Sequence, residues 1–124
     1  MVLAPPDIQV DIDPELLEQY AEEKQIVIIV EEHLNADSVY VDPDIRLTDP
    51  ATGAEARLVV AHNIPLYPDL IAVKSMPGPA HLVFNSLPED CLRFTLSEPK
   101  RVFRTPWHVE NIPRNKQDVY RLRI

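Results

Sequence analysis

The alternation of hydrophobic and polar positions along the chain predicts short strands. Leu92, Phe94 and Leu96 alternate with polar residues, which is the period of a strand with one buried face. An apolar run at 82–84 precedes them across a polar turn. Residues 81–98 are therefore predicted to form a hairpin at the centre of a β-rich core, with these apolar side chains buried.

Further strands follow from the same pattern. Residues 39–61 are predicted to form a second hairpin around a turn in which Gly53 accepts a positive φ. Residues 118–124 alternate again and predict a last strand at or near a sheet edge. Residues 70–74 leave room for one short strand or a turn of helix, and residues 101–104 for another short strand.

The N-terminal quarter predicts one helix. Residues 1–12 alternate weakly and indicate an extended arm or edge strand. Asp13 is a favoured N-cap before a proline, and an apolar face repeats over residues 14–24, where we expect a helix. Residues 25–34 are ambiguous between strand and helix, and we prefer a strand because 26–30 is a β-branched run.

These elements predict one domain over residues 1–124, with a β-rich core over 25–124. Thirteen prolines against two glycines favour short extended pieces over a helical bundle. The predicted fold class is mostly β: an antiparallel β-sandwich or open barrel of about seven short strands with one N-terminal helix.

No motif for catalysis or for a bound cofactor is found. With only two glycines the chain has neither a nucleophile elbow nor a phosphate-binding loop. The histidines, His33, His62, His81 and His108, do not have metal-ligand spacing, and Cys91 is the only cysteine. We therefore predict no catalytic residue, no metal site and no cofactor.

The closely spaced aspartates between residues 37 and 49 lack the glycine and terminal glutamate of a calcium loop. In turns, aspartate side chains accept hydrogen bonds from nearby backbone, and we expect Asp37, Asp42, Asp44 and Asp49 to do so.

The cysteine content and the N-terminal sequence indicate the cellular compartment of the protein. Cys91 is predicted to be buried or half-buried, and one thiol excludes an internal disulfide and fits a reducing compartment. The N-terminus lacks the pattern of a signal peptide, and the longest apolar run is too short to span a bilayer. We expect a cytoplasmic protein without a membrane segment.

Charge is distributed unevenly along the chain. The net charge of −8 divides into −11 for residues 1–50 and +3 for residues 51–124, and residues 93–124 carry +5. This asymmetry predicts two opposed charged surfaces or segments that pair with each other. The candidate binding residues on the basic side are Arg101, Arg104, Trp107, Arg121 and Arg123.

The function expected from these observations is that of a non-enzymatic protein-interaction module, such as an adaptor, inhibitor or assembly subunit. Its partner would be a protein, with a homodimer of this chain as one candidate, and the pI near 4.8 disfavours nucleic acid. The alternative is a small ligand-binding domain or enzyme whose site the fold assembles from acids and histidines. A deep pocket holding His81 or His108 beside an acid would favour that alternative, and a flat charged surface would favour the module.

Overall fold

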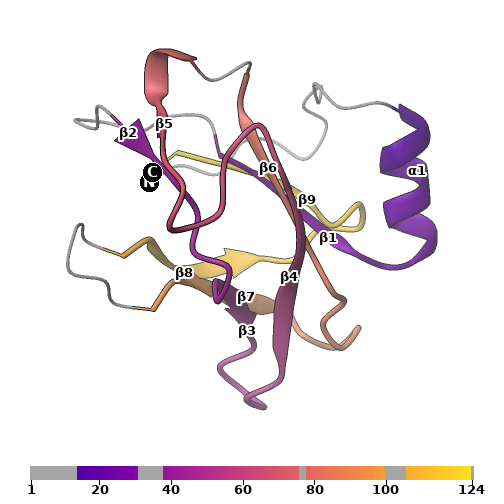
Figure 1. Cartoon of the computed structure of the whole chain (residues 1–124). Coiled ribbons are helices and arrows are strands. Elements are labelled where there is room, and N and C mark those ends of the chain that lie inside the picture. Colours follow the sequence, from indigo (N-terminus) through magenta and orange to yellow (C-terminus); the bar gives the residue numbers. More distant parts are fainter. Residues whose placement is uncertain (1–13, 31–37, 76–77, 100–105, 124) are drawn as a thin grey trace.

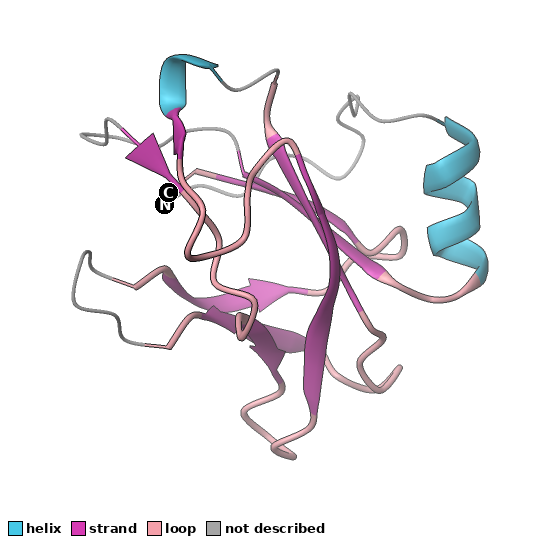
Figure 2. Cartoon of the chain, viewed as in Figure 1, coloured by secondary structure: helices cyan, strands magenta, loops and turns pink. Residues whose placement is uncertain are grey.

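The computed structural model describes residues 14–30, 38–75, 78–99 and 106–123 (Figure 1). In these residues a curled mixed sheet of seven strands forms a half-barrel, with the order β8-β7-β3-β4-β6-β1-β9, and β2 pairs with β5 in a small second sheet. Figure 2 shows strands dominating the chain, with α1 standing beside the sheet, so the predicted β-rich class is confirmed. The elements in chain order are α1 (Pro14–Glu22), β1 (Ile26–Val30), β2 (Ser38–Val39), β3 (Arg46–Thr48), β4 (Glu55–His62), β5 (Ile71–Ala72), the 3-10 helix η1 (Val73–Ser75), β6 (Ala80–Phe84), β7 (Arg93–Ser97), β8 (His108–Pro113) and β9 (Val119–Leu122).

Strand β1 resolves the ambiguity of residues 25–34 in favour of a strand at 26–30. All five of its residues are buried, which matches its unbroken β-branched run. Ile26 and Ile28 point into the main core inside the half-barrel. Val27 and Ile29 point outward into a smaller apolar cluster, against which Tyr20 of α1 packs. The strand is buried on both faces because α1 lies outside the sheet at this point.

Helix α1 ends two residues before the predicted boundary. Lys24 has a positive φ of 57°. The Gln25 N–H donates to the Tyr20 carbonyl at 2.9 Å, and the Lys24 N–H donates to the Ala21 carbonyl at 3.0 Å. These two bonds form a Schellman motif, which satisfies carbonyls that the helix leaves without internal partners.

The hairpin predicted within residues 39–61 is confirmed for β3 and β4, which pair antiparallel. Its turn contains Gly53 at a φ of 79°, a conformation that disfavours other residues. Asp49 accepts hydrogen bonds from the Ala51 N–H and the Thr52 hydroxyl, each at 2.9 Å. The aspartate therefore stabilises the turn as expected.

The hairpin predicted over residues 81–98 is wrong. Strand β6 pairs with β4 and β1, whereas β7 pairs with β3 and β8. Every residue of β6 is buried, while β7 alternates between buried and more exposed residues. A strand buried on both faces belongs in the middle of the covered part of a sheet, so β6 takes central neighbours and the 85–92 connection leads away to β7.

Leu92 is the one predicted core residue of this stretch that lies outside the core. Its side chain is 80% exposed, because it precedes β7 in the connection instead of continuing its alternation. Phe84, Phe94 and Leu96 are fully buried, as predicted.

The sheet is mixed because β9 runs parallel to β1 and the other pairings are antiparallel. Parallel neighbours need a long crossover, and nearly the whole described chain separates these two strands. Strand β9 comes last in the strand order, which agrees with the predicted edge position among the described strands. Tyr120 and Leu122 point into the core, and Val119 and Arg121 are on the opposite face.

Residues 70–74 contain both predicted alternatives, a two-residue strand and the start of a 3-10 turn. The strands expected within residues 1–12 and at 101–104 lie outside the described residues.

Candidate functional site

The outer face of the curled sheet is divided into an apolar half and a polar half. Over β1 and β6, the outward side chains of Val27, Ile29 and Val83 are buried, with Tyr20 packed against them. Over the other half, most outward residues are charged or hydroxylated and more exposed, and the exposed residues there also include Val59, Asn111 and Pro113. This second half is the part of the sheet that can meet a partner directly.

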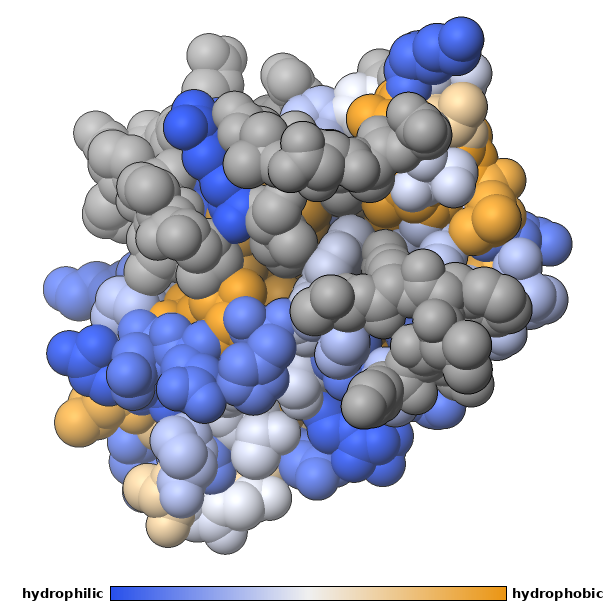
Figure 3. Space-filling view, turned by 90° about the vertical axis from the view of Figure 1, so that its left-hand side faces the viewer, coloured by the Kyte–Doolittle hydropathy of each residue, from blue (hydrophilic) through white to orange (hydrophobic). Residues whose placement is uncertain are grey.

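We call this polar half the arginine face. It consists of the outward residues Glu55 and Arg57 of β4, Arg46 and Thr48 of β3, Arg93, Thr95 and Ser97 of β7, and His108 and Glu110 of β8. Figure 3, which views the left-hand side of Figure 1, shows hydrophilic surface dominating at the level of β3, β7 and β8. With a neutral histidine the arginine face carries one net positive charge, in a chain of net charge −8.

Two arginines of this face are direct cross-strand partners. Arg46 on β3 is in register with Arg57 on β4. A single carboxylate serves both: Glu55 lies 3.2 Å from the Arg46 guanidinium and 3.7 Å from that of Arg57. The arginine side chains are 33% and 54% exposed. Two guanidinium groups that share one carboxylate leave a local excess of one positive charge. Like charges directly opposite each other also destabilise a strand pair.

The histidine on this face does not form a catalytic triad. His108 Nε2 lies 3.0 Å from Glu110 Oε1, and both side chains are more than half exposed. Ser97 is the cross-strand partner of His108, yet no hydrogen bond joins their side chains. A serine nucleophile needs that bond to its base and a donor site for the oxyanion.

The other histidines are dispersed in the fold. His62 contacts the Tyr20 hydroxyl at 3.0 Å, and His81 is buried on β6. His33 lies outside the described residues.

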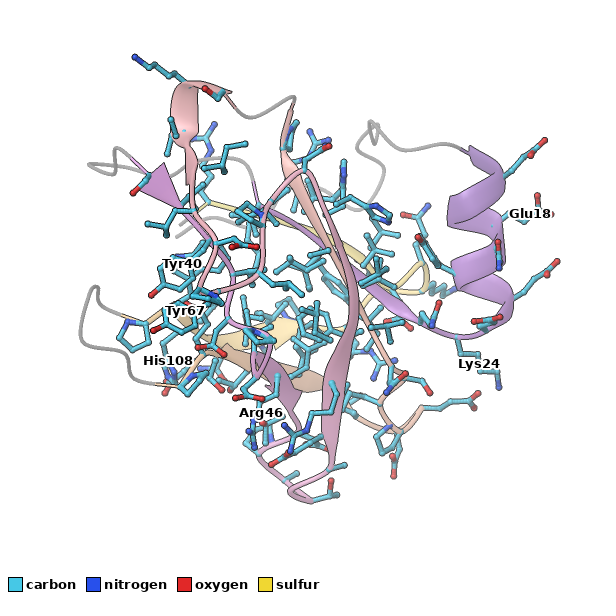
Figure 4. All side chains as sticks on the ribbon, in the orientation of Figure 1. Glu18, Lys24, Tyr40, Arg46, Tyr67 and His108 are labelled. Carbon is cyan, nitrogen blue, oxygen red and sulfur yellow. The ribbon has the colours of Figure 1, made fainter. Side chains whose placement is uncertain are left out.

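A separate cleft of about 290 Å³ lies where α1 ends. Its walls come from the end of α1, the 85–92 connection and the turn at 114–118. Figure 4 shows Lys24 beside the end of α1, on a different side of the molecule from His108. The residues that line it are mostly polar: Ala21, Lys24, Gln25, Ser86, Leu87, Glu89, Arg114, Asn115, Lys116, Gln117 and Asp118. No histidine is among them.

One wall of the cleft is held by a hydrogen-bonded turn. The Arg114 guanidinium contacts both carboxylate oxygens of Asp118, at 3.0 and 3.1 Å. The Tyr120 hydroxyl donates to Asp118 at 2.9 Å and accepts from the Asn115 N–H at 3.0 Å. Burial of the Tyr120 hydroxyl raises its pKa, so the phenol stays neutral. These groups are occupied with one another and shape the wall.

The mouth of the cleft is crossed by an ion pair. Lys24 Nζ lies 2.9 Å from Glu89 Oε1, and these side chains are 70% and 82% exposed. The hydrogen bond and charge of Glu89 raise the pKa of Lys24, and Lys24 lowers the pKa of Glu89. Exposed pairs of this kind are screened by water and weakly held, so this contact is easily exchanged.

The predicted binding residues are in different environments. Trp107 is buried just before β8, and its backbone N–H donates to the Glu98 carboxylate at 2.9 Å. Arg121 is half-buried on β9 next to Ile29 of β1, and Arg123 is exposed beyond β9. Arg101 and Arg104 lie outside the described residues. Trp107 is therefore a core residue.

Sequence reasoning missed Arg46 and Arg57. The predicted hairpin over 39–61 contained the signal, because the strands that flank a six-residue turn place these two positions opposite each other.

Cys91 is buried, as predicted, and its Sγ lies 3.1 Å from the Arg93 carbonyl oxygen. Burial raises the pKa of its thiol, which opposes a nucleophilic role near neutral pH.

Among the described residues, no three His, Cys, Asp or Glu side chains gather closely enough to hold a metal ion. No helix in this part of the chain combines the length and the apolarity needed to cross a membrane. Comparisons with protein-family models, with curated proteins and with solved structures find no match to this chain.

Proposed function

We propose that this protein is a non-enzymatic protein-interaction module, and that the arginine face contacts an acidic segment of its partner. The observation that carries the proposal is the cross-strand pair of Arg46 and Arg57 with one carboxylate between them. A further carboxylate from a partner would balance the second guanidinium, and arginine binds carboxylates in two-pronged geometry.

The exposure of the arginine face supports this role. The arginine side chains are a third to a half exposed, so a partner reaches them without rearranging the core. Arg93 adds a third exposed cation on β7. Hydroxyl groups of Thr48, Thr95 and Ser97 lie between the charges and can hydrogen-bond to a polypeptide backbone.

A second charged surface lies elsewhere on the molecule. The exposed side of α1 carries Glu18, Glu22 and Glu23. Figure 4 shows Glu18 pointing outward on the helix, well away from Arg46. Separated charges of opposite sign orient a partner during encounter and discriminate among partners.

An acidic protein segment fits this face better than nucleic acid or a second copy does. Nucleic acid brings one charge per nucleotide along its whole length toward a chain of net charge −8. Binding of single strands also uses exposed aromatic rings, which the arginine face lacks. A second copy brings its own eight excess negative charges, which repel those of the first copy.

The test uses nuclear magnetic resonance titration of the 15N-labelled chain with a synthetic peptide that alternates glutamate and valine. The same peptide with lysine in place of glutamate is the control ligand. We expect the acidic peptide to change the chemical shifts of amides in β3, β4 and β7 only. Its affinity should fall as the salt concentration rises, because salt screens exposed charges. Arg46→Thr or Arg57→Thr should reduce affinity about tenfold, the effect of losing one buried charged contact.

The control variant is Lys74→Thr, because Lys74 is exposed on η1, outside the arginine face. Equal binding of the lysine peptide, or unchanged affinity in both arginine variants, would contradict the proposal. Tighter binding of a single-stranded oligonucleotide to the same residues would identify a different class of partner. A rise in mass by light scattering at low salt, lost in Arg57→Thr, would show that the partner is a second copy.

A further inference from the structure

We propose that the cleft at the end of α1 is a second binding site, distinct from the arginine face, which takes a ligand bearing a carboxylate. The ligand is either a free organic acid or an acidic side chain presented by a polypeptide. Its carboxylate would bind between the ammonium groups of Lys24 and Lys116, both of which line the cleft.

The shape of the cleft is set before any ligand arrives. Arg114 donates to Asp118 and to the Pro88 carbonyl oxygen, at 3.1 Å in the latter case, so it ties the 114–118 turn to the opposite wall. Asn115 Oδ1 accepts the N–H groups of Gln117 and Asp118 at 3.0 and 2.7 Å. A preorganised wall lowers the ordering cost of binding.

The groups left to meet a ligand are polar. Because Arg114 and Asp118 neutralise each other, the remaining charges in the cleft are the two lysines and Glu89. Lys116 is exposed and forms no ion pair with the described residues. The amides of Gln25 and Gln117 and the Ser86 hydroxyl also line the cleft and can bond to further oxygens of a ligand. This set fits a small anion with several polar atoms better than it fits an apolar ligand.

Glu89 supplies the most specific support. Its carboxylate already lies on Lys24 at 2.9 Å, at the mouth of the cleft, in the position that a ligand carboxylate would take. Both side chains are largely exposed, so the contact is screened and weakly held. Glu89 is thus a competitor that an incoming carboxylate displaces.

At about 290 Å³ the cleft lies just below the range of volumes found for small-molecule sites, which begins at roughly 300 Å³, so only a small ligand fits. A four- or five-carbon dicarboxylic acid is of suitable size. The test ligands are glutarate, the capped tripeptide acetyl-Ala-Glu-Ala-amide and the neutral glutaramide, each titrated into the 15N-labelled chain at low salt.

We expect glutarate or the peptide to shift the amides of Gln25, Ser86, Lys116 and Gln117, and glutaramide to leave them unchanged. Tighter binding of glutarate identifies a free acid as the ligand, and tighter binding of the peptide identifies a polypeptide. Lys24→Gln and Lys116→Gln should each weaken binding about fivefold to tenfold, the scale of one charge-assisted contact.

The decisive variant is Glu89→Gln. Removal of the competing carboxylate should strengthen binding about twofold to fivefold, which a merely structural residue would not do. Lys74→Gln is the matched control, because Lys74 is an exposed lysine on η1 and does not line the cleft. Arg57→Thr should leave this affinity unchanged, so failure at the arginine face and failure at the cleft are separable.

Unchanged or weaker binding in Glu89→Gln would overturn the proposal, as would equal binding of glutaramide. Shifts confined to residues outside the cleft would overturn it as well. Thermal melts of each variant verify that the fold is retained, which is expected because the substituted side chains are exposed.

Discussion

Phe94 of β7 and Tyr120 of β9 meet edge to face inside the half-barrel, with ring centroids 5.0 Å apart and an interplanar angle of 82°. Their strands lie at positions two and seven of the sheet order. The contact therefore spans the interior and holds the curled sheet together near its two ends. Edge-to-face pairs contribute beyond the apolar area that they bury.

Phe94→Ala should lower the free energy of unfolding by about 3–5 kcal/mol, because the fully buried ring would leave a cavity. Chemical denaturation measures the loss. Leu92→Ala is the control, since that side chain is 80% exposed, and should change stability by less than about 0.5 kcal/mol. A loss below about 1 kcal/mol for Phe94→Ala would show that the ring is not central to the core.

Tyr120→Phe removes a hydroxyl that accepts from Asn115 and donates to Asp118. We expect a loss of about 1–3 kcal/mol, because the Asn115 N–H is left without its acceptor in a partly buried turn and Asp118 loses one of its donors. Tyr20→Phe removes only the bond to His62 and should cost less. Equal losses in denaturant melts would mean that the 114–118 turn does not depend on Tyr120.

Arg57→Thr should leave stability unchanged or raise it by about 0.2–1 kcal/mol, because it removes a like charge directly opposite Arg46. The gain should shrink at high salt, since exposed charges are screened. Arg93→Thr, opposite Pro113, is the control and should show no such gain. A clear loss of stability in Arg57→Thr would indicate that Glu55 balances both arginines, and would weaken the case for an acidic partner.

Acid should destabilise the protein partly through Asp49. The hydrogen bond from the Ala51 N–H lowers the pKa of this carboxyl below its usual value, despite burial, which acts in the opposite direction. A lowered folded-state pKa supplies stability above the unfolded value of about 4, and that stability is lost as pH falls through the folded-state pKa. Asp49→Asn should make the free energy of unfolding fall less steeply as pH is lowered. Melts at a series of values between about pH 6 and pH 2 measure this dependence. Asp90→Asn, at an exposed acid, is the comparison, and an equal effect of both variants would remove Asp49 from this role.

Helices, strands and turns that are determined by a few neighbouring residues could be predicted from the sequence. The β-branched run at 26–30 indicated a strand buried on both faces, and the proline and glycine of the 49–53 turn placed β3 beside β4. The apolar face at 14–24 indicated α1 within two residues of its end. These features depend on backbone preference, side-chain period and turn chemistry, which are local properties.

Strand neighbours and both candidate sites were decided by the tertiary structure. Alternation says which face of a strand is buried but not which strand lies beside it, so β6 was wrongly paired with β7. The same limit hid the parallel pairing of β9 with β1 and the exposure of Leu92. The arginine pair could not be predicted without the register of β3 and β4. The cleft is formed by three segments that lie far apart in sequence. These segments meet only because burial of the whole set of apolar side chains selects one arrangement of the strands.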